Sequence, residues 1–202
     1  RDDWRRTGVN MSLMRLKVLS TVFCVAALCL TQAAFGKVFS MAVKATTPGP
    51  QILDLRGGAK VQANLPAGYR LAALALPQRV TYMFLGPDNK NGEHAVMSVD
   101  VLPVTAKLSS PKAVFETVFA AYSAGTNDFK STISKPFSVN GINFDRANFE
   151  GTMDGVRSKG FAVVTRLKQG FCVMVARDKE SDFKRTEPVL MSVVNSCRLN
   201  SR

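Results

Sequence analysis

Along much of the chain, apolar residues recur at every second position, which is the spacing typical of strands. In the run HAVMSVDVLPV, one side carries Ala95, Met97, Val99 and Val101 and the other carries His94, Ser98 and Asp100. Similar strand-like runs include 61–65 and 79–85, and a polar hexamer at 87–92 predicts a hairpin connection. The pattern predicts a protein built largely of strands.

The apolar period changes to that of a helix in SSPKAVFETVFAAYSAG. Ser110 is placed to cap the first turn and Pro111 occupies the first helical position. The apolar residues at helical spacing are Val114, Phe115, Val118, Phe119 and Tyr122. We predict a helix over 110–124 with an apolar stripe that faces the core.

A pair of later strands is apolar on both sides. The segments KGFAVVTRL and GFCVMVARD are joined at 168–170, which predicts a hairpin. In the second segment the residues alternate between two faces, Phe171, Val173 and Val175 on one and Cys172, Met174 and Ala176 on the other. A strand that is buried on both faces needs cover on both faces, and we expect helices to supply it.

The C-terminal segment SDFKRTEPVLMSVVNSCRL predicts a second covering helix. Pro188 suits a first turn, and Leu190, Val193, Val194 and Cys197 follow at i, i+3, i+4 and i+7. This spacing turns Cys197 toward the sheet that carries Cys172. The predicted fold class is α+β, an antiparallel sheet covered by helices on both faces.

This order of elements resembles the PsbP-like family. The resemblance covers about residues 51–199 and is carried by LPAGYR, the helix at 110–124, VNGINFDRANFEG, the hairpin KGFAVVTRLKQGFCVMVARD and the closing helix ending SVVNSCRL. It implies an α/β/α sandwich with a binding or assembly role and without catalytic residues. The chain differs from the exported lipoproteins of that family in lacking a lipid-attachment cysteine.

The stretch MRLKVLSTVFCVAALCLTQAAFGK, residues 14–37, has the three parts of an export signal. Arg15 and Lys17 precede an apolar run of 13 residues, 18–30, and small residues follow. A helix that crosses a membrane needs roughly 20 apolar residues, so we expect cleavage. The alternative is an uncleaved N-terminal anchor that uses the whole uncharged run, 18–36.

Three segments follow from this interpretation. Residues 1–36 are expected to be a signal peptide with an upstream extension, translation beginning at Met11 or Met14. Residues 37–50, which end in KATTPGP, are expected to be a flexible leader, and 51–202 a single domain. The predicted location is periplasmic or extracellular.

Export changes the expected chemistry of the cysteines. Without the signal only Cys172 and Cys197 remain, and an oxidising compartment favours a disulfide between them. Two separate buried thiols are the alternative, because free cysteine is among the most buried residue types. Sequence alone leaves both open, since it does not give the distance that the bond requires.

The chain is basic, with 27 Lys and Arg against 15 Asp and Glu and a net charge of +12. Export makes nucleic acid an improbable partner, so we expect an unknown protein or an anionic envelope component, and a membrane only if the signal stays uncleaved. Arg146, Arg157 and Lys159 lie near aromatic residues and form a candidate basic surface. The alternative is a basic outer edge over a packed core.

Catalytic and metal-binding signals are weak. Without the signal, His94 is the only imidazole, and neither a nucleophile motif nor paired metal-ligand spacing accompanies it. The Gly pair in LRGGAK lacks the rest of a phosphate-binding loop. We predict no cofactor and no metal. The expected function is an exported, non-catalytic binding or assembly module, and the alternative is a hydrolase-like or ligand-processing envelope enzyme that uses His94.

Overall fold

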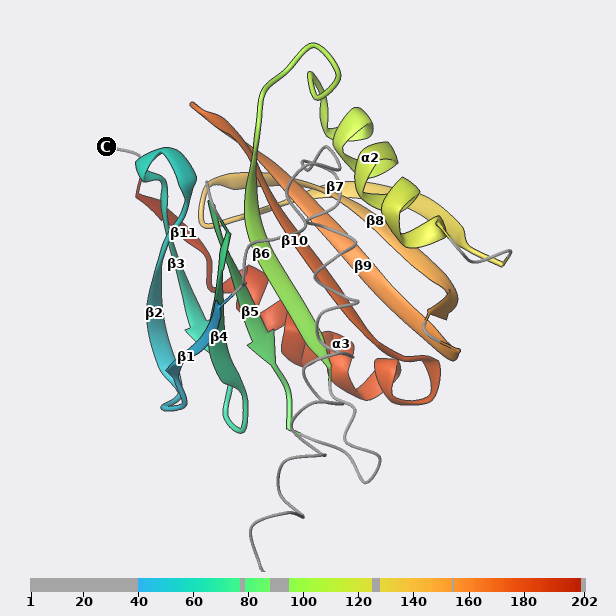
Figure 1. Cartoon of the computed structure of the whole chain (residues 1–202), viewed down its shortest axis with the longest axis horizontal. Helices are drawn as coiled ribbons and strands as arrows, with labels where there is room; N and C mark the ends of the chain where they lie inside the picture. The colour runs from blue at the N-terminus through green and yellow to red at the C-terminus, as the bar shows by residue number, and fades with distance from the viewer. Residues whose placement is uncertain (1–39, 77–78, 88–94, 125–127, 154, 201–202) are drawn as a thin grey trace, which may run out of the picture.

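The computed structural model describes residues 40–76, 79–87, 95–124, 128–153 and 155–200 (Figure 1). Eight strands form the large sheet, in the order β1-β4-β5-β6-β10-β9-β8-β7. Their bounds are β1 Ser40–Ala45, β4 Arg70–Leu76, β5 Arg79–Leu85, β6 Val96–Pro103, β7 Lys130–Val139, β8 Ile142–Met153, β9 Val156–Leu167 and β10 Gly170–Lys179. Each neighbouring pair is antiparallel.

A smaller antiparallel sheet has the order β11-β3-β2. It consists of β2 Gly49–Asp54, β3 Lys60–Leu65 and the short C-terminal strand β11 Arg198–Asn200, with a 3-10 turn, η3 Arg56–Gly58, between β2 and β3. The helices of the described ranges are α2 Pro111–Ser123 and α3 Glu180–Asn195. Two early strands, β2 and β3, therefore meet the last described strand in one sheet.

The helix predicted over 110–124 is confirmed. The hydroxyl of Ser110 accepts a hydrogen bond from the backbone N–H of Ala113 at 3.3 Å, which caps the first turn. Pro111 occupies the first turn, where its missing N–H removes no helical hydrogen bond. All five residues of the predicted apolar stripe are buried.

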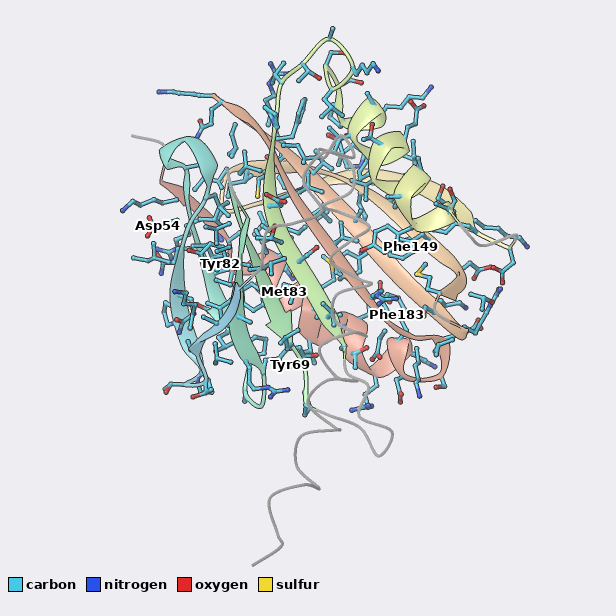
Figure 2. All side chains as sticks on the ribbon, in the orientation of Figure 1. Asp54, Tyr69, Tyr82, Met83, Phe149 and Phe183 are labelled. Carbon is cyan, nitrogen blue, oxygen red and sulfur yellow. The ribbon has the colours of Figure 1, made fainter. Side chains whose placement is uncertain are left out.

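The two helices lie on opposite faces of the large sheet. On one face, α2 packs on Phe171, Val173 and Val175 of β10 and on neighbouring residues of β8 and β9. On the other face, α3 packs in a cluster that contains Cys172 and Met174. Figure 2 shows Phe149 beneath α2 and Phe183 on α3. The two apolar faces expected for the β9–β10 hairpin are therefore both buried.

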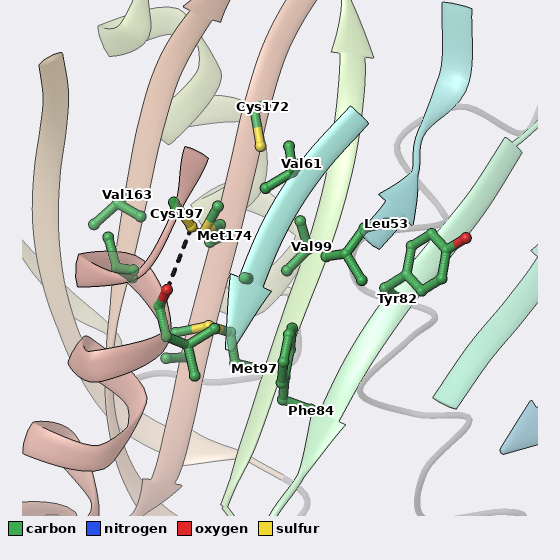
Figure 3. Packing of buried hydrophobic residues seen from close by; sticks show 14 of the residues in the cluster. Leu53, Val61, Tyr82, Phe84, Met97, Val99, Val163, Cys172, Met174 and Cys197 are labelled. Atoms are coloured by element: carbon green, nitrogen blue, oxygen red, sulfur yellow. Dashed lines mark hydrogen bonds between the residues drawn. The ribbon is translucent and has the colours of Figure 1, made fainter. Parts of the chain in front are cut away.

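The predicted α/β/α sandwich is wrong, because helices do not form complete outer layers. The described chain is mostly antiparallel strand with two helices, and α3 packs mainly on β9 and β10 of the large sheet. Beside α3, the small sheet places Leu53 and Val61 in the same cluster as Val99 of β6 (Figure 3). The sequence pattern required cover on both faces, and a sheet supplies part of that cover. A sheet-rich fold is the correct description.

The flexible leader expected over 37–50 contains regular structure. Residues 40–45 form β1, which pairs with β4, and Gly49 begins β2. Ala42 and Val43 are exposed, so backbone pairing rather than apolar burial holds β1 in place. An exposed edge strand carries no apolar alternation, which is why the pattern missed it. Residues 1–36, where the signal peptide is predicted, lie outside the described ranges.

The closing helix begins earlier than predicted. α3 starts at Glu180, and Pro188, expected in the first turn, lies inside the helix. Glu180 and Asp182 place negative charge in the first turn, where the helix dipole favours it. Leu190, Val193 and Val194 are buried as the periodicity predicted, whereas Cys197 follows the end of the helix.

The close packing of β9 gives a test at Gly160. A Cβ atom at this position would lie 2.3 Å from the carbonyl oxygen of Ala176 and 2.3 Å from the ring of Phe149. We expect Gly160→Ala to lower the free energy of unfolding by about 1 to 3 kcal/mol, as overpacked core sites do. Urea unfolding measures the change. Gly151→Ala in β8, where the nearest atom lies at 3.2 Å, is the control, and equal effects at both sites would contradict the account.

Candidate functional site

The predicted basic residues lie on the face of the sheet that α3 covers. Arg146 is on β8, and Arg157 and Lys159 are on β9. In the β8–β9 register, Arg146 pairs with Val163 and Lys159 pairs with Glu150. Because Val163 belongs to the cluster under α3, the three basic side chains share that face. The structure therefore brings the candidate residues together between β8, β9 and α3.

Acidic side chains surround two of these cations. The guanidinium of Arg157 pairs with Asp128 and Glu180, at 2.5 and 3.3 Å, and with Glu150 at 3.5 Å. The ammonium of Lys159 lies 2.8 Å from Glu180 and 3.7 Å from Glu150. Glu180 stands at the start of α3, so this network joins the helix to the sheet.

Arg146 has its own set of partners. It pairs with Glu187 of α3 and donates from Nε to the Asn148 side chain at 3.0 Å. Its guanidinium also lies 4.9 Å from the centre of the Phe161 ring, a cation–π distance. Each residue of the predicted basic surface is therefore neutralised by carboxylates, and the three do not form an open cationic patch.

The network shifts the titration of its members. Hydrogen bonding to Lys159 lowers the pKa of Glu180, and the same pair raises the pKa of Lys159. The backbone N–H and the hydroxyl of Thr152 donate to Asp128 at 2.8 Å, and together with Arg157 they lower the pKa of Asp128 to about 2. Asp128 and Glu180 consequently stay charged at neutral pH.

A groove of about 580 Å³ runs beside this network, between α3 and β7–β9. Its charged lining residues are Lys130, Lys159, Lys184, Glu150, Glu180 and Glu187. Polar Thr132 and Asn148 and the ring of Phe183 complete much of the wall. Lys130 and Lys184 are exposed and form no ion pair with another described residue. The other charged groups of the groove therefore neutralise one another, and Lys130 and Lys184 are available to bind a ligand.

One wall of the groove is an edge strand. Among the strands that the structure describes, β7 pairs with β8 alone, so its outer edge carries backbone groups that these strands do not use. Its pairing is regular over 130–134 and shifts register before Phe137, at a segment that contains Pro136. Ile133 is 61% exposed on the face away from the groove, opposite Ala147 of β8. The regular half of β7 is open to a further strand, whereas the bulge and Pro136 protect the other half.

Sequence reasoning found the cations and missed the site around them. Glu180 and Glu187 lie on α3 before the point where the helix was predicted to begin, and Asp128 precedes β7 in the chain. Their pairing with Arg157 or Arg146 depends on contacts between distant segments. The acidic residues spaced at 180, 182 and 187 were the signal that could have indicated an earlier helix with a charged face.

The two predicted disulfide partners are free thiols in the structure. Both are buried in the cluster under α3, and the thiol of Cys197 donates to the carbonyl oxygen of Val193 at 3.3 Å. Figure 3 shows Cys197 beside Met174. Burial raises the pKa of Cys172, and it raises that of Cys197 to about 12. The prediction that the two share a layer is confirmed, and the bond is not present in this structure.

The structure also bears on His94, on metal binding and on membrane-spanning helices. His94 lies outside the described residues. In the ranges that the structure describes, no group of three or more His, Cys, Asp or Glu side chains is arranged to hold a metal ion. Neither α2 nor α3 combines the length and apolar character needed to cross a membrane.

Three solved structures similar to this one give the comparison with known proteins. A protein of unknown function from Pseudomonas aeruginosa has a TM-score of 0.48 and 11% identity, covering 76% of this chain and 99% of its own. The solution structure of PsbP from the cyanobacterium Synechocystis sp. PCC 6803 has a TM-score of 0.49 and 9% identity, covering 85% and 99%. LpqN, involved in cell envelope biogenesis of Mycobacterium tuberculosis, has a TM-score of 0.44 and 10% identity, covering 85% and 98%.

A PsbP structure is among these similar structures, with a TM-score of 0.49, and the PsbP-like resemblance seen in the sequence stays a prediction. At such low sequence identities, structural similarity assigns neither a partner nor an activity to this chain. No protein-family model and no curated protein matches the sequence. Support for a function therefore comes from the residues of this chain and their arrangement.

The pH dependence of the charged network can be measured with Asp128→Asn. Because the pKa of Asp128 is lowered in the folded state from its ordinary 3.8, its stabilising contribution is complete above pH 3.8 and is lost as the pH falls toward 2. We expect the wild type to exceed the variant in urea stability near neutral pH and the two to converge in acid. Asp54→Asn, at an exposed ion pair with Lys60, is the control. A difference that persists unchanged at acid pH would contradict this role.

Thiol accessibility tests the state of the two core cysteines. We expect a full chain with Cys24 and Cys29 replaced by serine to show almost no reaction with Ellman's reagent while folded, because both remaining thiols are buried and protonated. Denaturant without reductant should then release two titratable thiols. Recovery of none under those conditions would show that Cys172 and Cys197 are bonded.

Proposed function

We propose that this chain is an exported, non-catalytic module that binds an extended polypeptide segment along β7. The observation that carries the proposal is the juxtaposition of an open strand edge with the charged groove. Backbone groups on such an edge can pair with an added strand, and the neighbouring side chains then determine which sequences fit. Export is inferred from the N-terminal sequence and stands as part of the proposal.

The two faces of β7 define the chemistry of the partner. Lys130 and Thr132 face the groove under α3, because they pair with Glu150 and Asn148 of β8. Ile133 faces the other way and is largely exposed. An added strand would therefore meet an apolar contact on one face and available lysines on the other. The proposed partner is a segment in which apolar and acidic residues alternate.

The charge balance of the groove favours this partner over a polyanion. Arg146, Arg157 and Lys159 are already paired with carboxylates, so a polyanion would encounter Glu150, Glu180 and Glu187 along with the cations. Lys130 and Lys184 are the groove cations available to acidic side chains. Electrostatic complementarity of this kind contributes to specificity and to the rate of association.

Binding of synthetic strands provides the test. A fluorescein-labelled peptide of alternating Glu and Val should bind the full chain more tightly than a matched peptide of alternating Lys and Val, as fluorescence anisotropy can measure. Ile133→Asp should weaken binding of the Glu-Val peptide by roughly tenfold, since it removes an apolar contact and places a charge against the valine side chains of the added strand. Val43→Asp is a matched control, because Val43 is 57% exposed on β1, the opposite edge strand of the same sheet.

Either of two results would overturn the proposal. One is equal binding of the Glu-Val and Lys-Val peptides by the wild type. The other is equal loss of binding in Ile133→Asp and Val43→Asp, because the regular half of β7 would then have no special role. Matching thermal unfolding curves for the two variants would show that a loss of binding does not come from a loss of fold.

A further inference from the structure

A second cleft, of about 720 Å³, lies at the other end of β8. It is lined by the β7–β8 turn, the end of β9 and the last strand, β11. The lining residues are Asn140, Gly141, Ile142, Asn143, Thr165, Arg166, Arg198 and Leu199. In Figure 1 the β7–β8 turn lies beside β11. This cleft shares no lining residue with the groove along β7.

The charges of the two sites differ. Two arginines and no acidic residue line the second cleft, whereas three glutamates line the groove. Arg198 is exposed, and its side chain makes no ion pair or hydrogen bond with another described residue. Arg166 donates to the carbonyl oxygen of Ser109 at 3.5 Å and lies over the Phe171 ring, without a carboxylate partner in the described chain. The second cleft therefore keeps the positive charge that the groove neutralises.

A neutral hydrogen-bond donor accompanies this charge. Thr165 is only 4% exposed, and its hydroxyl forms no hydrogen bond with another residue that the structure describes. A buried hydroxyl without a partner is costly, so a ligand that accepts its proton would stabilise the site.

The wall of the cleft is fixed by Asn140, at the turn between β7 and β8. Its backbone adopts a positive φ of 50°, and its side-chain amide donates to the carbonyl oxygens of Asn195 and Cys197 at 3.3 and 3.0 Å. These bonds hold the turn against the end of α3 and the start of β11. A preformed wall lowers the entropy cost of binding.

We infer that this cleft binds a small amphipathic anion, a phosphate or carboxylate attached to an apolar body. Arg198 supplies the charged contact, which suits either group because guanidinium can donate two parallel hydrogen bonds. Thr165 supplies a neutral donor. Ile142 and Leu199 are half-buried in the lining and offer contact to the apolar part. The shared chemistry fits both a soluble anion of this kind and the headgroup region of an anionic lipid.

The test is a titration of the isotope-labelled full chain with octyl phosphate, in which the chemical shifts of the backbone amides report binding. We expect the largest shifts around Gly141, Thr165 and Arg198, and weaker binding of octanol, which lacks the charge. Arg198→Gln should weaken octyl phosphate binding by roughly tenfold, because it removes a charge-assisted hydrogen bond. Arg185→Gln is the control, since Arg185 is an exposed arginine of α3 that lines neither the cleft nor the groove.

Thr165→Val provides a second variant, which removes the hydroxyl at nearly constant volume and should also weaken binding. Absence of shifts in the cleft, equal affinity for octanol, or unchanged affinity in Arg198→Gln would overturn the inference. Vesicles of phosphatidylglycerol and phosphatidylcholine separate the two ligand sources. If the protein sediments with the phosphatidylglycerol vesicles, and Arg198→Gln reduces this binding while Arg185→Gln does not, the ligand is a lipid headgroup. Octyl phosphate binding without vesicle binding would assign a soluble anion.

Discussion

The rest of the structure depends on the burial of the β9–β10 hairpin on both faces. Val163 and Met174 contribute to one apolar layer, and Val164 and Val173 contribute to the other. Burial of such side chains is the main favourable term in folding, so each face must be covered. α2 covers one face, while α3 and the small sheet share the other. The C-terminal segment returns to the start of the domain for this reason, as β11 pairs with β3.

The candidate sites lie at the edges of the face that α3 and the small sheet cover. Near the start of α3, polar residues of β8 and β9 extend past the apolar cluster and pair with Glu180 and Glu187. Beyond them, β7 has one neighbouring strand in the described part of the sheet. At the other end of β8, the turn and β11 enclose the cationic cleft. The apolar centre fixes the framework, and the ends of its strands present the polar groups.

Local patterns predicted the elements that bury apolar side chains. The helix capped by Ser110 and the two-faced hairpin could be predicted because their spacing is periodic in the sequence. β1 could not, since Val43 is exposed and the strand is placed mainly by backbone pairing with β4. The type of cover on the α3 face was predicted wrongly, because the pattern on β10 requires apolar neighbours without specifying a helix or a sheet. The pairing of Arg157 with Asp128 and Glu180 depends on tertiary contacts that spacing does not contain.

Amide hydrogen exchange tests the central claim, that a rigid two-faced centre supports an open binding edge. In the free protein, amides in the middle of β9 and β10 should exchange only through global unfolding, and the outward-pointing amides of the two edge strands, β7 and β1, should exchange fastest within the large sheet. A bound strand should slow exchange in 130–134 and leave β1 unchanged. The account would be contradicted if, in the free protein, the outward-pointing amides of β7 were as protected as those of β9. Slowed exchange at β1 rather than at β7 on binding would also contradict it.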